Sequence, residues 1–159
     1  MKTFDLTLKN LGLEGVDHIN ISMESVIRVG KILDPYYVKS IEIPEYGKFS
    51  SVMSYWRYLQ SPDKDDRIRK LVLRELREYT KNTAIYLNRV DKLPEHLYTA
   101  TKIKLSAYPN FLEELRTRHK DTLLVSYNTI KASEYKMHTG YSKLIIEVVD
   151  AIRKEVDTN

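Results

Sequence analysis

The chain has 159 residues, no cysteine and a net charge of +4, with basic and acidic residues interspersed. A chain of this length buries a core without covalent links, so we expect a single domain over residues 1–159. The lack of cysteine excludes disulfides and thiolate metal sites and is typical of a cytoplasmic protein. No run approaches the about 20 apolar residues of a membrane span, and residues 1–8 lack the apolar stretch of a signal peptide. We therefore expect no membrane contact.

Three short β segments are predicted. Residues 18–22 and 37–43 alternate apolar and polar side chains, which is typical of strands with one buried face. Pro44 ends the second segment, and a turn is expected at 46–48. Residues 122–127 are mostly apolar and predict the third segment.

Most of the remaining chain predicts helices. Apolar residues from 52 to 59 recur with the spacing of one helical face, and Ser51 is the expected N-cap. Serine, proline and three acids over residues 61–66 predict a second helix that runs to about residue 79. Further helices are expected at 94–108, 109–115 and 141–156. Helix outweighs strand, so the sequence predicts a mainly helical α+β fold.

The sequence lacks the common catalytic and metal-binding motifs. Its four histidines are scattered without metal-ligand spacing, so we expect no metal site. It contains no GxSxG elbow, no GxGxxG fingerprint and no P-loop. The sequence therefore predicts neither a serine triad nor one of the standard nucleotide-cofactor folds, and no cofactor is expected.

Three helical side chains have two interpretations each. Lys104 shares a stripe with Leu97 and Ala100, so it either extends to the surface, which we expect, or holds an anion inside a pocket. An aromatic pair on an amphipathic helix, such as Tyr55 and Trp56, usually belongs to the core. The alternative is a wall that stacks on a base at the mouth of a pocket.

Several segments carry a family resemblance when they are taken in order. Residues 18–21 are HINI, residues 30–33 are GKIL, and residues 46–56 are YGKFSSVMSYW. Residues 100–115 follow the spacing AxxxKxxxxPxxxxxL. The chain ends with LLVSYN at 123–128 and with LIIEVVDAIR at 144–153.

This series resembles NADAR (YbiA-like) domains over nearly the whole chain, from about residue 18 to 155. The family usually has INIYS, GxxLSNF, GxFxSVExYW, AxxxKxxxxPxxxxxL, LPFxHYY and WIIxxLExIR. The resemblance implies a compact, mainly helical YbiA-like domain with short β segments and a pocket for an ADP-ribose-like ligand. Active members are N-glycosidases that hydrolyse the bond between the ribose anomeric carbon and a nitrogen. A carboxylate near that carbon stabilises the oxocarbenium-like transition state or activates water.

The departures from the family pattern fall on segments that line its site. Met53 stands at the position of the family glutamate, and a thioether neither takes a proton nor offsets positive charge. The family's SNF corresponds to Asp34-Pro35-Tyr36 and its HYY to Ser126-Tyr127-Asn128. Features of the scaffold, such as Phe49 and the last helix, are retained. This pattern indicates a pocket that is retained or remodelled while the usual catalysis is lost.

The resemblance assigns ligand-binding roles to five residues: Gly30, Tyr55, Trp56, Lys104 and Tyr127. Lys104 would face phosphate. The catalytic residue stays unknown, and three acids in neighbouring segments are candidates for a relocated one: Asp34, Glu42 and Glu134.

Three functions fit this sequence, and the oligomeric state stays open. The favoured one is binding of an ADP-ribose- or NAD-related nucleotide, including one linked to nucleic acid through a modified base, without efficient hydrolysis. The first alternative is an active N-glycosidase with a relocated acid. The second is a purely structural or protein-interaction domain. In each case we expect a cytoplasmic protein, in the host cytoplasm if a phage encodes it.

Overall fold

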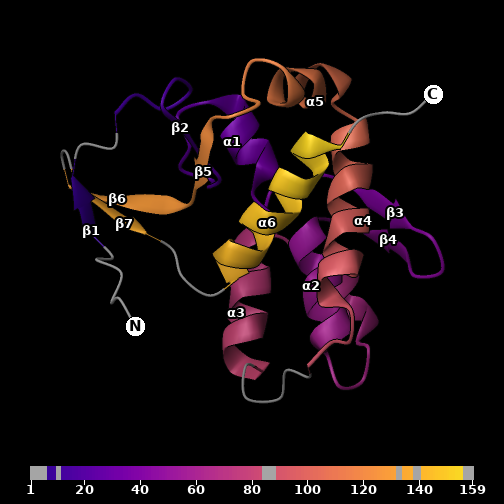
Figure 1. Ribbon diagram of the computed structural model, residues 1–159. Helices are drawn as coiled ribbons and strands as arrows, with labels where there is room; N and C mark the ends of the chain where they lie inside the picture. Colours follow the sequence, from indigo (N-terminus) through magenta and orange to yellow (C-terminus); the bar gives the residue numbers. More distant parts are fainter. Residues whose placement is uncertain (1–6, 10–11, 84–88, 132–133, 138–140, 156–159) are drawn as a thin grey trace. The chain divides into compact units, whose positions relative to one another are not determined.

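The computed structural model describes residues 7–9, 12–83, 89–131, 134–137 and 141–155 (Figure 1). These residues have an α+β fold that is mainly helical, as the sequence predicts. They form two compact units. Unit 1 combines the two ends of the chain, residues 1–34 and 113–159, and unit 2 is the continuous segment 35–112. One domain over 1–159 stays a prediction.

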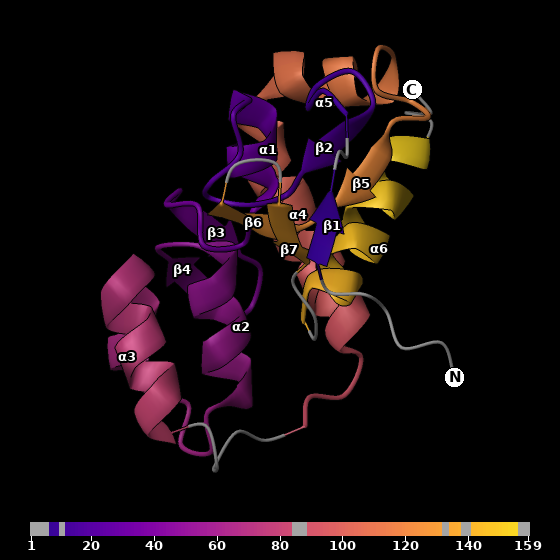
Figure 2. The same cartoon turned by 90° about the vertical axis from the view of Figure 1, so that its left-hand side faces the viewer.

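Unit 1 contains two small sheets and two main helices. The elements are β1 (Thr7–Lys9), β2 (His18–Asn20), α1 (Arg28–Leu33), the end of α5 (Pro109–Arg116), β5 (Leu123–Val125), β6 (Tyr127–Lys131), β7 (Glu134–Met137) and α6 (Tyr141–Lys154). The antiparallel sheet has the order β1-β7-β6, and β2 pairs with β5 in parallel (Figure 2). α6 packs against β5, and its buried stripe runs from Ile145 through Val149 to Ile152.

Unit 2 is a hairpin packed with helices. Its elements are β3 (Ile41–Ile43), β4 (Gly47–Phe49), α2 (Val52–Gln60), the 3₁₀ helix η1 (Asp66–Lys70), α3 (Leu73–Thr83), α4 (Leu93–Ser106) and the start of α5. α4 packs on both α2 and β3, and α2 also packs on η1 (Figure 1).

The start of α2 follows from its sequence. Ser51 Oγ accepts a hydrogen bond from the Ser54 backbone N–H at 3.1 Å, and Ser54 Oγ accepts one from the Ser51 N–H at 3.1 Å. This reciprocal capping box satisfies two N–H groups that a helix otherwise leaves without partners. The predicted cap is confirmed, and it fixes the direction in which α2 leaves β4.

The predicted helix from 62 to 79 is wrong. Residues 62–63 form a turn, η1 ends at Lys70, and α3 begins only at Leu73, which has a φ of 43°. The Ser50 N–H and Oγ donate to the carbonyl oxygens of Arg69 (2.8 Å) and Leu71 (2.7 Å). These hydrogen bonds hold this stretch of chain against Ser50, and Leu71 is extended there (φ −71°, ψ 137°), so the helix is interrupted between η1 and α3.

The strands are shorter than the alternating patterns that predict them. Of residues 37–43, only Ile41–Ile43 pair, with Gly47–Phe49, so the turn at 44–46 lies two residues before its predicted place. The predicted last helix is confirmed as far as Lys154, and Val156 lies outside the described residues. In the described part of the chain, no helix is both long and apolar enough to cross a bilayer.

Candidate functional site

The residues that the sequence assigns to a site fall into two groups. Unit 2 holds Glu42, Met53, Tyr55, Trp56 and Lys104, whereas unit 1 holds Gly30, Asp34, Tyr127 and Glu134. Each group is described within its own unit.

In unit 2, the helices α2 and α4 carry the position of the family acid and the inward lysine. Met53 is fully buried on α2, and Lys104 on α4 is only 1% exposed. The expectation that Lys104 extends to the surface is therefore wrong, because an extended ammonium would leave the residue far more exposed. A role for Lys104 in holding phosphate stays a prediction.

Tyr55 and Trp56 are also core residues, at 1% and 3% exposure. The Tyr55 ring lies 5.0 Å from that of Phe49 and 5.6 Å from that of Tyr46, and its hydroxyl is 2.9 Å from His96 Nδ1. Burial, with a smaller contribution from Tyr46, raises the pKa of Tyr55 from 10.0 to about 12. Tyr55 thus links α2 to α4 as a neutral phenol.

This shift predicts an alkaline loss of stability. A raised folded-state pKa makes the stabilisation complete below pH 10 and lost as the pH rises to about 12. We expect the free energy of unfolding to fall by about 1 kcal/mol per pH unit in this window because of Tyr55 alone. Denaturant unfolding at pH 9, 10 and 11 measures it, with Tyr55→Phe as the control for all other titrating groups. Parallel pH profiles for the two proteins would contradict the prediction.

In unit 1, the predicted ligand residues serve the packing of β2. A Cβ atom on Gly30 would lie 2.2 Å from Ser25 Oγ and 2.4 Å from the Asn20 carbonyl oxygen, so this glycine lets α1 approach β2 closely. The Asn20 amide exchanges two hydrogen bonds with the Tyr127 backbone, at 2.9 and 3.0 Å. The Tyr127 hydroxyl lies 2.7 Å from His18 Nε2.

The three candidate acids have different surroundings. Asp34 is buried at 6% exposure and accepts a hydrogen bond from the Met23 N–H at 3.0 Å. Glu42 is exposed on β3, directly opposite Lys48 of β4. Glu134 pairs through its backbone with Lys9 and Lys131, and its side chain lies outside the described set.

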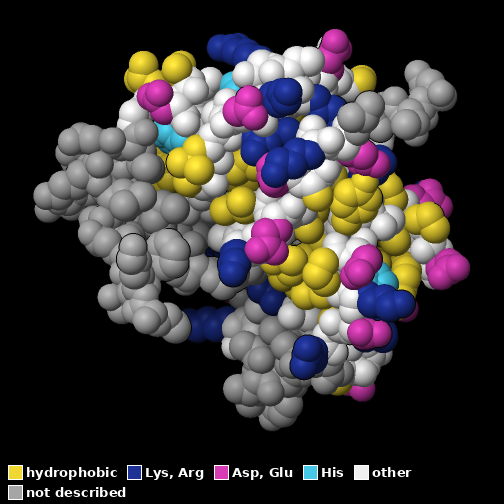
Figure 3. Space-filling view, viewed as in Figure 1, with side chains coloured by type: hydrophobic (Ala, Val, Ile, Leu, Met, Phe, Trp, Pro, Cys, Tyr) yellow, Lys and Arg dark blue, Asp and Glu magenta, His cyan; other side chains and the backbone are white. Residues whose placement is uncertain are grey.

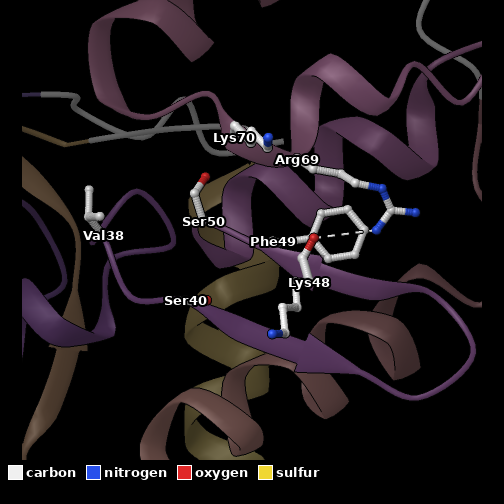
Figure 4. A pocket seen from close by; sticks show the side chains of 7 residues that line it. All are labelled: Val38, Ser40, Lys48, Phe49, Ser50, Arg69 and Lys70. Atoms are coloured by element: carbon white, nitrogen blue, oxygen red, sulfur yellow. Dashed lines mark hydrogen bonds between the residues drawn. The ribbon is translucent and has the colours of Figure 1, made fainter.

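A pocket that the sequence analysis missed lies in unit 2. It has a volume of about 510 Å³ and is lined by three cations, two serines and two apolar residues: Lys48, Arg69, Lys70, Ser40, Ser50, Val38 and Phe49 (Figure 4). None of the described residues that line it carries a carboxylate. Neither Met53 nor Lys104 lines it either, so it differs from the pocket that the resemblance implies.

The guanidinium of Arg69 is held by its neighbours. Its centre lies 4.5 Å from the ring centroids of both Phe49 and Tyr58. Nη1 donates to the carbonyl oxygens of Tyr46 (2.5 Å) and Lys48 (3.3 Å, the dashed line in Figure 4), and Nε donates to Asp66 at 2.8 Å. The bond to Asp66 raises the pKa of Arg69. Arg69 therefore fixes the hairpin against η1.

Lys48 and Lys70 are the cations of this pocket for which the described residues show no ion pair. Both are exposed, and within the described residues neither makes an ion pair. In the view of Figure 3, basic and acidic side chains are interspersed over the surface. Two lysines that line one pocket and make no ion pair among the described residues favour an anion.

A second pocket, in unit 1, does not share this chemistry. Its volume is about 390 Å³, and it lies between β5 and α6. Asp150 in its lining pairs with Arg153 at 2.6 Å and with Lys154 at 2.7 Å. These hydrogen bonds lower the pKa of Asp150, and the bond from Lys154 has the largest effect. Two of its cations are thus already paired with this carboxylate.

The described residues contain no group of three or more histidines and acids that could hold a metal ion. Comparisons with protein-family models, with curated proteins and with solved structures find no match for this chain. The resemblance to NADAR domains therefore rests on the residues quoted above.

Proposed function

We propose that this protein binds an ADP-ribose- or NAD-related nucleotide and does not hydrolyse it efficiently. The observation that carries the proposal is the cationic pocket of unit 2, which Phe49 and Ser50 line just before the cap of α2. These residues belong to the segment that resembles the family's GxFxSVExYW. A volume of about 510 Å³ lies within the range of small-molecule sites.

The lack of efficient hydrolysis follows from the side chains available. Cleavage of an N-glycosidic bond develops positive charge on the ribose, and a nearby carboxylate offsets it. Among the described residues no acid lines the cationic pocket, and Met53 stands where the resemblance would place the family's acid. Without that carboxylate, the rate falls by several powers of ten.

Calorimetric titration with ADP-ribose, NAD and ADP tests binding, and incubation with ADP-ribosylated guanosine or DNA tests hydrolysis. We expect heat of binding with at least one of these nucleotides and no release of ADP-ribose at high protein concentration. No heat with any of the three would contradict the proposal.

One observation favours the active N-glycosidase as a second candidate function. Glu42 is the one candidate acid in the same unit as the cationic pocket, and it faces Lys48 across the hairpin. Release of ADP-ribose that Glu42→Gln abolishes, with Glu45→Gln as a control on the same hairpin, would establish this alternative. It would also refute the lack of catalysis.

A further inference from the structure

Two separate segments bring Lys48 and Lys70 to the pocket of unit 2. Lys48 is the middle residue of β4, and its pairing with Glu42 in β3 fixes its backbone. Lys70 ends η1. Its two neighbours in the chain, Arg69 and Leu71, both offer their carbonyl oxygens to Ser50, at 2.8 and 2.7 Å. The Lys70 backbone is therefore held beside the end of β4.

Ser50 and Arg69 are engaged by other groups of the protein, so Lys48 and Lys70 are the cations left to bind a ligand. Ser50 Oγ already donates to the Leu71 carbonyl oxygen, and Arg69 is bound by Asp66 and two carbonyl oxygens. Lys48 and Lys70 each carry three N–H donors and, among the described residues, no ion pair. The close view shows their side chains on two sides of Ser50 and Phe49 (Figure 4).

The remaining surface of the pocket is poorly suited to a base. The Phe49 ring is 2% exposed because Arg69, Tyr55 and Tyr58 cover it. It offers no open face on which an adenine could stack. Val38 and Ser40 are exposed and small.

From these contacts we infer that the pocket recognises the diphosphate of its ligand, through Lys48 and Lys70, and that base and sugar contribute little. Arg69 acts as a positioning residue, since it holds the backbone of Lys48 and the stack around Phe49 and is itself paired. Glu42 weakens the site because it lies opposite Lys48. The inference deepens the proposed function and rests on it for the identity of the natural ligand. The oxyanion chemistry stands on the pocket alone.

Competition calorimetry at about 50 mM salt, where screening is weak, tests this inference. Inorganic pyrophosphate is expected to bind and to displace ADP-ribose, whereas adenosine is expected to show no heat. Lys48→Gln combined with Lys70→Gln is expected to weaken binding of both anions by about 100-fold, that is, by about tenfold for each hydrogen-bonded charge. Glu42→Gln is expected to strengthen binding by about twofold.

A matched control removes the same charge elsewhere. Lys31→Gln combined with Lys143→Gln neutralises two exposed lysines of unit 1 and is expected to leave both affinities unchanged. A circular dichroism melt checks that all variants fold.

The possible outcomes separate the two proposals. ADP-ribose binding that pyrophosphate does not displace would overturn the inference and leave the proposed function standing. Pyrophosphate binding without any nucleotide binding would overturn the proposed function and leave the oxyanion site. Equal losses in the Lys48/Lys70 variant and the Lys31/Lys143 control would overturn the inference, because they would indicate general attraction to a basic protein. Failure of both anions to bind would overturn both proposals.

Discussion

Met53→Glu is expected to lower the free energy of unfolding by about 3–5 kcal/mol at pH 7. Met53 is fully buried near the start of α2, and its backbone N–H donates to the Pro35 carbonyl oxygen at 2.8 Å. A buried carboxylate at this position loses its hydration, and this cost outweighs the favourable interaction of an acid with the N-terminal end of the helix dipole. Restoring the family's acid therefore competes with folding.

The pH dependence of this loss identifies its cause. Burial raises the folded-state pKa of the new carboxyl above its unfolded value of about 4.3. The variant is therefore least destabilised below that value and loses stability as the pH rises towards 7. Denaturant unfolding at pH 5 and pH 7 should show a larger difference from the natural protein at pH 7.

Two controls separate charge from shape at this position. Met53→Leu conserves volume and is expected to cost less than about 1.5 kcal/mol. Met53→Gln has the size and polarity of the glutamate without its charge, so it should lie between the two and show no dependence on pH from this site. A Met53→Glu protein as stable as the natural one would show that an opposite charge or water reaches this position.

Gly30→Ala is expected to destabilise the protein by about 2–3 kcal/mol. In an ordinary helix, this substitution stabilises by up to about 1 kcal/mol because alanine has the higher helix propensity. Here the new methyl group would lie 2.2 Å from Ser25 Oγ and 2.4 Å from the Asn20 carbonyl oxygen. The serine can turn away, but the carbonyl is backbone of the β2 strand, so overlap decides the sign.

Thermal unfolding of Gly30→Ala beside Lys31→Ala measures this effect. Lys31 is the next residue of α1 and is exposed, so its substitution tests helix propensity without overlap. A stabilised Gly30→Ala protein would contradict the close approach of α1 to β2. If Gly30→Ala folds and binds ADP-ribose with unchanged affinity, its role is packing rather than ligand binding.

The sequence predicts those parts of the fold that local interactions determine. The start of α2 depends on Ser51 and Ser54, which are three residues apart. The helix α6 and its buried face are predicted by apolar residues that recur with a period of about 3.6. Both are visible in a short window. The break between η1 and α3 is not, because it depends on Ser50, about 20 positions earlier, whose donors take the carbonyl oxygens of Arg69 and Leu71. The proline and acids at 62–66 favour a helix start whether the helix then continues to residue 79 or stops at Lys70.

The candidate site shows the same limit. Lys48 and Lys70 are ordinary surface lysines in the sequence, and only the pairing of β4 and the bonds of Ser50 bring them to one pocket. Lys104 illustrates the reverse case, since its stripe of small and apolar neighbours does indicate burial, while the high cost of a buried ammonium argues for the surface. Helix packing of α4 on α2 and β3 decides between the two.

The composition of unit 1 from both ends of the chain has a consequence for synthesis. Ile21 and Ser126, which extend the pairing of β2 with β5, are 105 positions apart, whereas unit 2 is continuous. A nascent chain leaving the ribosome therefore presents all of unit 2 before β5 exists. During that interval the apolar residues Ile19 and Ile21 have no partner strand. Contacts between segments so far apart in the sequence also form slowly. Translation thus imposes an order on assembly, middle segment first and joined ends last.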